Sequence, residues 1–300
     1  MDLEQKSIER IKMASEMSLH HYGKPLICTY SGGKDSDVML ELFKRSGVPF
    51  EVSNSHTTVD APPTVYHIRD VFRDLELMGI HCDINYHRRP DGHLLTMWNL
   101  IPNKLMPPTR TVRYCCKELK EGDGANRMIA TGVRWAESVK RRGREVFEYA
   151  SSVKDRRIAA SMEIMLANDN DTSRRMIEKC ELKAKTVCNP IIDWRDSDVW
   201  DFYWHECKKH NPLYHMGYTR VGCIGCPLAK KKERKKEFAD FPTYERAYKR
   251  AFEKMLCVRS VRSLRVDSGW KSAEEVFRWW MEDDNIEGQL SMFDDVDDVE

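Results

Sequence analysis

Residues 26–36, with the sequence LICTYSGGKDS, decide how the first half of this chain folds. The first five form a short apolar run of strand-forming residues, bounded by Gly23-Lys24-Pro25 before it and by Ser31-Gly32-Gly33 after it. Beyond the glycines, apolar residues recur at helical spacing as far as Gly47, which suits a helix C-terminus. The stretch therefore predicts a buried strand, a glycine turn and a helix in that order.

The same alternation continues along the chain. Residues 50–54, 81–86 and 128–131 are predicted strands, and residues 64–78 a helix. Such alternation implies right-handed crossovers and a mostly parallel sheet covered by helices, so the expected fold class is α/β. A helical, cysteine-bearing C-terminal region should follow, because aromatic side chains recur at helical spacing in residues 199–208, 244–255 and 273–281.

Charge and composition suggest three regions. We expect an α/β domain over residues 1–195, a helical region over 196–280 and an acidic flexible tail over 281–300, with a polar loop at 166–173. The total of 49 Lys and Arg against 48 Asp and Glu is nearly balanced, but the tail holds nine acids and no base. The remaining chain therefore carries 39 acids against 49 bases, which suits an anionic substrate.

The sequence also suggests where the protein works. No apolar run reaches the roughly 18 residues that a membrane-spanning helix needs, and residues 1–19 lack the basic and apolar regions of a signal peptide. We therefore expect a cytoplasmic protein with no membrane partner. In such a compartment the ten cysteines are expected to serve metal binding, redox chemistry or burial rather than disulfides.

The turn at residues 31–36, Ser-Gly-Gly-Lys-Asp-Ser, has the properties of a phosphate site. Adjacent glycines permit positive φ and close approach, so backbone N–H groups can line a nest at the positive end of the helix dipole. Lys34 adds a positive charge, and Ser31 and Ser36 add hydroxyl donors. The spacing matches neither the Walker P-loop nor the dinucleotide pattern, and a plain strand-to-helix turn is the alternative.

With four further segments, this turn resembles the PP-loop of the adenine-nucleotide α-hydrolase superfamily. Together they resemble the phosphoadenosine phosphosulfate reductase family over roughly residues 26–280, which implies a Rossmann-like fold. The resemblance is closest to the ATP-pyrophosphatase branch, which includes the sulfur-inserting protein of DNA phosphorothioation. The further segments are residues 56–62 (HTTVDAP), 131–138 (TGVRWAES), 189–194 (NPIIDW) and 222–227 (GCIGCP).

The resemblance implies that ATP and Mg²⁺ bind at the carboxyl edge of the sheet. Asp60 is a candidate Mg²⁺ ligand, with a helix cap near Pro62 as the alternative. Arg134 could clamp the α-phosphate. Arg141 and Arg142 could do the same, or form a solvated basic face. The expected catalytic residues are Lys34, Asp35 and Arg134. The expected nucleotide-binding residues are Ser31, Gly32, Gly33, Lys34, Asp35, Ser36, Thr58, Asp60, Gly132 and Arg134.

Cysteine spacing points to a metal centre. Cys223 and Cys226 form a C-x-x-C loop in which both sulfurs can reach one metal. In the branch that the chain resembles, the ligands of a [4Fe–4S] cluster correspond to Cys116, Cys180, Cys223 and Cys226. Cys115 is an alternative ligand, and Zn²⁺ is the alternative metal because an all-cysteine zinc site also uses four thiolates.

The other cysteines are expected to pack in the interior. Cys28 and Cys82 fall inside predicted strands, and Cys257 falls in an apolar helical stretch that favours a core position over a nucleophile. The family's reductases attack with a thiol in a Glu-Cys-Gly-Ile-His motif, which residues 1–300 do not contain. We therefore expect ATP-dependent adenylylation of an acceptor, with pyrophosphate release, for sulfur or related group transfer.

Two other functions stay open, together with two possible partners. The chain could be a phosphoadenosine phosphosulfate or adenylylsulfate reductase, or a non-catalytic nucleotide-sensing module. Basic runs at residues 230–237 and 140–144 suit either nucleic acid or a solvated helix face. The peptide from Gln289 to Phe293, QLSMF, is similar to the motif that docks in the bacterial sliding clamp, with a tail folded onto the helices as the alternative.

Overall fold

The computed structural model describes residues 2–89, 91–120, 124, 127–149, 186–261 and 270–282. The chain divides into two compact units, Met1–His87 with Leu119–Gly222, and Arg88–Glu118 with Cys223–Glu300. Residues 196–222 thus group with the sheet and not with the C-terminal helices. Neither unit is one continuous stretch, because Arg88–Glu118 groups with the C-terminal helices. The loop expected at residues 166–173 and the tail beyond residue 282 lie outside the described residues. None of the described helices is long and apolar enough to cross a membrane.

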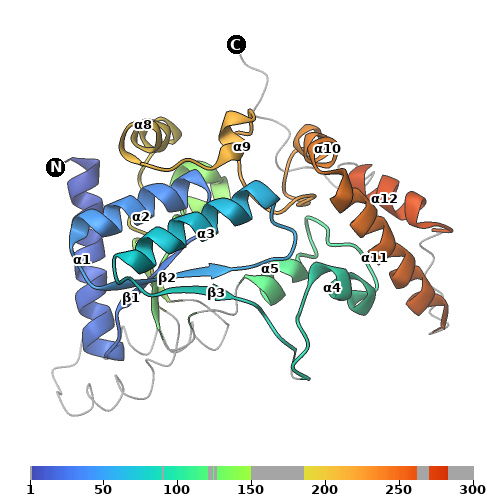
Figure 1. Ribbon diagram of the computed structural model, residues 1–300, viewed down its shortest axis with the longest axis horizontal. Helices are drawn as coiled ribbons and strands as arrows, with labels where there is room; N and C mark the ends of the chain where they lie inside the picture. Colours follow the sequence, from blue (N-terminus) through green and yellow to red (C-terminus); the bar gives the residue numbers. More distant parts are fainter. Residues whose placement is uncertain are drawn as a thin grey trace. The chain divides into compact units, whose positions relative to one another are not determined.

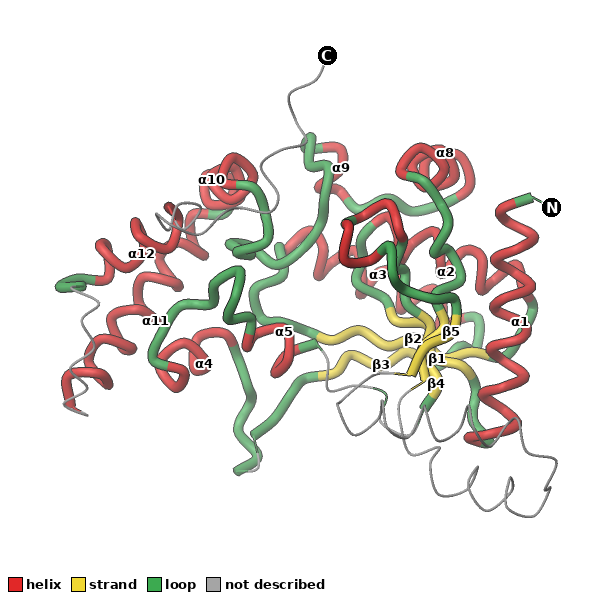
Figure 2. Tube along the Cα trace, turned by 180° about the vertical axis from the view of Figure 1, so that it is seen from behind, coloured by secondary structure: helices red, strands yellow, loops and turns green. Residues whose placement is uncertain are grey.

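The first unit is built on a six-stranded sheet of order β3-β2-β1-β4-β6-β5. Every neighbouring pair is parallel except β5 with β6, which confirms the expected mostly parallel α/β fold (Figure 2). The sequence did not predict β5 or β6. The strands are β1 (Leu26–Thr29), β2 (Phe50–Ser55), β3 (Cys82–Asn85), β4 (Met128–Ala130), β5 (Phe147–Tyr149) and β6 (Thr186–Cys188).

Helices α1 (Leu3–Tyr22), α2 (Lys34–Ser46) and α3 (Pro62–Leu77) pack on one face of this sheet (Figure 1). Helix α2 ends before Gly47, whose φ of 71° confirms the predicted stop signal. Helix α8 (Asp196–Glu206) packs on α2, and the short α9 (Pro212–His215) packs on α3. Two 3₁₀ turns, η1 (Trp135–Glu137) and η2 (Val139–Arg141), follow β4.

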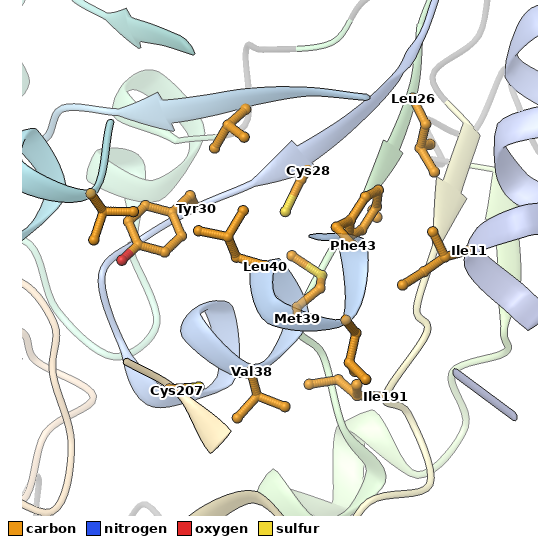
Figure 3. Close-up of a cluster of buried hydrophobic side chains, with 14 of the residues drawn as sticks. Ile11, Leu26, Cys28, Tyr30, Val38, Met39, Leu40, Phe43, Ile191 and Cys207 are labelled. Atoms are coloured by element: carbon orange, nitrogen blue, oxygen red, sulfur yellow. The ribbon is translucent and has the colours of Figure 1, made fainter. Parts of the chain in front are cut away.

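Strand β1 alternates its side chains between the two faces of the sheet. Leu26 and Cys28 are fully buried on the helical face, while Ile27 joins Ile129 and Val187 in a separate cluster. Figure 3 shows Cys28 pointing toward Leu40 and Met39 of α2, with Phe43 of the same helix beside it. Burial of a side chain the size of Phe43 contributes about 2–3 kcal/mol, so this contact anchors the helix that follows the glycine turn.

Residues 189–194 contact α1 through ion pairs and a hydrogen bond from a tryptophan side chain. Asp193 accepts hydrogen bonds from Arg10 Nη1 at 2.7 Å, Arg10 Nη2 at 3.0 Å and Lys6 Nζ at 2.5 Å. Burial raises the pKa of this carboxyl, but the two cations outweigh burial and lower the pKa to about 2. The indole N–H of Trp194 donates to Ser7 Oγ at 2.9 Å. This segment therefore has a structural role within the sheet unit.

The second unit is helical, as expected for the C-terminal part of the chain. Helix α11 packs on α4, α10 and α12, and Tyr248, Phe252 and Trp280 form its fully buried aromatic core. Cys257 was expected in this core, but it is exposed. Phe252 and Met255 lie on the buried stripe of α11, and Cys257 is two residues further, about 200° around the helix. The helices are α4 (Met97–Lys104), α5 (Tyr114–Leu119), α10 (Lys231–Asp240), α11 (Pro242–Val261) and α12 (Ala273–Glu282).

Gly225 connects this core to the C-x-x-C loop. Its φ is 71°, and a Cβ there would lie 2.8 Å from both Phe238 Cζ and Trp280 Cη2. Its amide donates to Glu237 Oε2 at 2.7 Å. Both the backbone conformation and the packing therefore require glycine at this position.

Alanine at Gly225 should destabilise the protein more than alanine at Gly217. Both residues have positive φ (71° and 80°), but a Cβ at Gly217 would meet nothing within 4 Å. We expect Gly217→Ala to cost about 1 kcal/mol from backbone strain and Gly225→Ala about 2 kcal/mol more from overpacking. Urea unfolding followed by tryptophan fluorescence measures both, and equal losses would contradict the packing argument.

Asp193→Asn should lower stability in a pH-dependent manner. Because folding lowers the pKa of Asp193 to about 2, its ionised form stabilises the fold above the unfolded pKa near 4. That contribution, about 2 kcal/mol, should be lost as the pH falls from about 4 toward 2. Urea titrations of both proteins between pH 7 and pH 2 should converge at the acid end. A difference that stays constant over this range would refute the assignment.

Candidate functional site

The glycine turn lies at the point where the order of the parallel strands reverses. From β1 the chain continues to β2 on one side, whereas β4 lies on the other side of β1. Ligands of open α/β sheets bind at such a switch point, outside the carboxyl ends of the strands. Gly132 follows β4, and a Cβ there would lie 3.3 Å from the backbone carbonyl of Asp35. The turns after β1 and β4 therefore meet at this edge.

The predicted nest of backbone amides is formed. The N–H groups of Ser31 and Gly33 both point to Ser36 Oγ, at 3.3 and 3.1 Å, and this hydroxyl donates to the Gly33 carbonyl at 2.8 Å. Gly32 has a φ of 72°, and a Cβ there would lie 2.8 Å from Ile68 Cγ1. The turn thus presents converging donors at the start of α2, an arrangement that suits an anion.

Two cations flank Asp35. Lys34 Nζ lies 2.9 Å from Asp35 Oδ2, and Arg134 Nε donates to Asp35 Oδ1 at 2.6 Å. Lys34 Nζ also lies 5.3 Å from the centre of the Trp200 ring. The structure thus brings together the three residues expected to be catalytic.

Arg134 is held by the protein on every side. It is 1% exposed, and its Nη1 donates to the Trp194 carbonyl at 3.2 Å and its Nη2 to Asp196 Oδ1 at 2.7 Å. Burial alone would lower its pKa, but Asp35 and Asp196 outweigh burial and raise it. The guanidinium is therefore charged, and in this structure it orients Asp35 with all three of its nitrogens bonded to protein acceptors.

The loop after β2 places Thr58 and Asp60. Thr58 adopts a φ of 66°, unusual for a residue other than glycine. Asp60 Oδ2 accepts a hydrogen bond from the Thr57 amide at 2.9 Å and lies 3.6 Å from His56 Nδ1. Helix α3 has Ala61 at its N-cap position, so Asp60 lies one residue before the cap.

The two arginines after η1 differ in their contacts. Arg141, in η2, forms an ion pair with Glu137 of η1, and Arg142 is exposed. Among the described residues, neither arginine forms a hydrogen bond or ion pair with the glycine turn or with Asp35.

Helix α9 and its N-cap residue supply contacts that the sequence did not reveal. The Lys34 amide donates to the hydroxyl of Tyr214 at 2.8 Å, and Asn211 Nδ2 donates to the Gly32 carbonyl at 2.7 Å. Asn211 followed by Pro212 is a helix-start signal, which predicts α9 but not its position. These contacts span about 180 residues of sequence, so only the folded chain reveals them.

A buried polar cluster supports the turn from behind. Asp37 accepts a hydrogen bond from the Tyr30 hydroxyl, and His67 Nε2 lies 3.2 Å from Asp37 Oδ1 and 3.0 Å from the Tyr30 hydroxyl. Asp37 lies on α2, His67 lies on α3 and Tyr30 directly follows β1, so the cluster joins the elements that surround the turn.

In the second unit, four cysteines approach one another. The thiol of Cys115 shares a hydrogen bond with Cys116, and this bond, burial and the neighbouring Cys223 and Cys226 all raise the pKa of Cys115. The Cys226 amide donates to the Cys223 carbonyl at 3.2 Å, which closes the C-x-x-C loop. The Tyr248 hydroxyl donates to the Ile224 carbonyl of this loop at 2.9 Å, and burial, followed by Cys223, Cys115 and Cys226, raises the pKa of Tyr248.

The metal assignment is therefore incomplete in the described part of the chain. There, no three His, Cys, Asp or Glu side chains are arranged to hold a metal ion. Cys180, the remaining predicted ligand, lies outside the described residues.

Cys28 is buried as expected, and Cys82 is half-buried. Cys188 and Cys207 are buried in the sheet unit.

The basic run of α10 is only partly available to a partner. Arg234 is 3% exposed, stacks 4.4 Å from the Trp280 ring and donates to the Trp280 carbonyl. Lys232 and Lys235 are exposed. The predicted clamp peptide, from Gln289 to Phe293, lies outside the described residues.

Comparison with known proteins places this arrangement in a family. Residues 25–229 match the phosphoadenosine phosphosulfate reductase domain. An uncharacterized protein of Methanocaldococcus jannaschii is 26% identical over 73% of this chain, which spans only 39% of that protein. An adenosine 5'-phosphosulfate reductase of Anoxybacillus flavithermus is 22% identical over 75% of this chain and 85% of its own length.

A solved phosphoadenylyl-sulfate reductase from Candida auris is similar over 73% of this chain and 88% of its own, with a TM-score of 0.46 and 15% identity. The domain match covers well over half of the chain and includes the glycine turn, the Gly132 turn and the C-x-x-C loop. The chain belongs to the phosphoadenosine phosphosulfate reductase family.

Proposed function

We propose that this protein is a PP-loop ATP pyrophosphatase that adenylylates an acceptor for sulfur or related group transfer. The observation that carries the proposal is the nest of Ser31 and Gly33 amides, with Lys34 and Asp35 beside it, at the strand switch point. Such a nest suits the β- and γ-phosphates of ATP, because its donors and the dipole of α2 favour negative charge.

The proposed reaction is a displacement at the α-phosphorus. An acceptor oxygen forms a bond to this phosphorus while the bond to the bridging oxygen breaks, and pyrophosphate leaves with the electron pair. The acceptor's proton passes to solvent or to a nearby base. A sulfur nucleophile then displaces AMP from the activated acceptor. Positioning and electrostatic stabilisation supply most of the rate in reactions of this kind.

Lys34 and Asp35 have complementary roles in this proposal. In the structure they pair with each other, and a bound polyphosphate would offer Lys34 a stronger partner. Asp35, released by Lys34 and held in place by Arg134, would then bind Mg²⁺ with Asp60 as a second carboxylate. Thr58 and Gly132 would line the nucleotide from the neighbouring turns. In this proposal Arg134 serves the reaction through the orientation of Asp35, and its charge would also favour the nearby phosphates.

We propose a [4Fe–4S] cluster on Cys116, Cys180, Cys223 and Cys226, with Cys115 as the alternative ligand and Zn²⁺ as the alternative metal. The donor set supports this assignment, because Cys115 and Cys116 lie near the thiols of the C-x-x-C loop. When bound, such a cluster supplies iron to which a sulfur atom can bond. Tyr248 and the loop amides would surround the cysteines and exclude water from them.

A sulfonucleotide reductase is the second candidate function. It is favoured by the relative from Anoxybacillus flavithermus, which is named an adenosine 5'-phosphosulfate reductase and is matched over 85% of its length. The same nest would then bind a nucleotide phosphate. Sulfite release from a phosphosulfate in the presence of a thiol, without ATP, would select this function.

Lys34→Ala should reduce pyrophosphate release from ATP by about 100-fold, the usual effect of removing one group that stabilises developing phosphate charge. The matched control is Lys44→Ala at the other end of α2, where Lys44 forms an ion pair with Glu41 of the same helix. Pyrophosphate release is measured with DNA, tRNA and small-molecule acceptors.

Lys44→Ala should keep wild-type activity. Pyrophosphate release by Lys34→Ala at the wild-type rate would refute the assignment of the nest. Failure of the wild-type protein to release pyrophosphate with every acceptor, together with sulfite release from a phosphosulfate, would replace the first function by the second.

Cys223→Ser should lose most of the bound metal, because a hydroxyl is a much poorer ligand for iron than a thiolate. Cys257→Ser, an exposed cysteine on α11 in the same unit, is the control and should keep it. Anaerobic purification with iron, sulfide and zinc assays measures the content. Zinc without iron would select the alternative metal, and wild-type metal content in Cys223→Ser would contradict the site.

A further inference from the structure

Tyr214 reaches into the proposed phosphate nest from a distant part of the sequence. Its hydroxyl accepts the hydrogen bond of the Lys34 amide at 2.8 Å. A Cβ built on Gly33 would lie 3.5 Å from the same oxygen, so the hydroxyl lies directly over the turn. Lys34 is the first residue of α2, and its amide is one of the four at a helix start that lack partners within the helix.

The hydroxyl of Tyr214 has an unused proton. Tyr214 is 8% exposed, and within the described residues its hydroxyl accepts this one hydrogen bond and donates none. Burial is the main reason that the pKa of Tyr214 is raised, so the phenol keeps its proton at physiological pH. A buried O–H without an acceptor is unfavourable, and a phosphate oxygen would be a strong acceptor for it.

Asn211 fixes the position of this tyrosine. Its side-chain amide donates to the Gly32 carbonyl at 2.7 Å and to Thr64 Oγ1 at 3.1 Å, while its Oδ1 accepts from the Leu213 amide at 3.0 Å. Asn211 is fully buried. It therefore fastens α9 to the turn, three residues before Tyr214.

The ring of Tyr214 is equally constrained. It makes edge contacts with Trp200 and Tyr203 at centroid distances of 5.0 and 5.3 Å. Trp200 also lies beneath Lys34 Nζ. The hydroxyl is thus preorganised over the nest, and binding requires little further ordering of the side chain.

We propose that Tyr214 is a polyphosphate-binding residue of this site. When a terminal phosphate enters the nest, one of its oxygens accepts the hydrogen bond of the Lys34 amide in place of Tyr214. The Tyr214 hydroxyl then donates a hydrogen bond to that phosphate. Asn211 is a positioning residue that keeps α9 against the turn. This inference rests on the proposed nucleotide function and adds a contact from outside the glycine turn.

The test compares ligands that differ in their phosphates. Isothermal titration of the full chain with ATP, pyrophosphate and AMP, with Mg²⁺ present, is carried out on wild type and Tyr214→Phe. Tyr214→Phe keeps the ring and removes the hydroxyl. We expect about tenfold weaker binding of ATP and pyrophosphate, as for loss of one hydrogen bond to a charged group, and unchanged binding of AMP.

The control is Tyr22→Phe, which removes a hydroxyl hydrogen bond of 2.7 Å to Thr186 Oγ1, where β6 begins. This variant should bind all three ligands as wild type does. Equal weakening of AMP and ATP by Tyr214→Phe would reveal a merely structural role and overturn the inference. Unchanged or tighter ATP binding would overturn it too.

The two proposals fail in different ways. If the wild type binds ATP and pyrophosphate but Tyr214→Phe binds them equally well, only the role of Tyr214 is lost. If the wild type binds neither, the nucleotide site itself is wrong, and the inference falls with it. Thermal melting of both variants checks that each is folded.

Discussion

The amide groups at the start of α2 are the constraint on which the sheet unit depends. A helix start leaves four N–H groups without partners, and here they lie at a crowded sheet edge. Ser36 Oγ accepts two amides of the turn, and Tyr214 accepts the Lys34 amide. Positive φ at Gly32 makes this geometry possible, and a larger residue there would meet Ile68. The acceptors of the Ser31, Gly33 and Lys34 amides are neutral hydroxyls, which in the proposed function a phosphate would replace at a gain in electrostatic energy.

Charge around the nest follows from this constraint. Burying Arg134 is costly unless its charge is compensated, and Asp35 and Asp196 supply that compensation. Asp35 also pairs with Lys34, so one carboxylate is shared between two cations. In the proposed function, a polyphosphate with Mg²⁺ would enter this arrangement without leaving a charge unpaired, because Lys34 would pair with phosphate while Asp35 bound the metal. The positive and negative side chains that pair in the protein thus match the phosphate and metal charges of the proposed ligand.

The sequence predicted what depends on local pattern and could not predict what depends on distant contacts. A few neighbouring residues determine strand β1, the glycine turn and the helix end at Gly47. The α/β class and the nest could therefore be predicted from the sequence. Strands β5 and β6 span three residues each and, unlike the equally short β4, are not followed by a glycine that would mark the end of the strand. The contacts of Asn211 and Tyr214 cross about 180 residues. Cys257 was misplaced because an apolar neighbourhood in sequence does not say which side of a helix a residue occupies.

The C-x-x-C loop differs from a metal site that folds only around its ion. Its conformation is imposed by protein contacts: Gly225 lies under Phe238 and Trp280, and the Tyr248 hydroxyl donates to the Ile224 carbonyl at 2.9 Å. Small zinc domains lack such support and unfold without metal. Here the aromatic core holds the loop, so ordering the loop does not reduce the free energy of metal binding. In the proposed function, this supported loop would present Cys223 and Cys226 to the cluster without having to be ordered by the metal first.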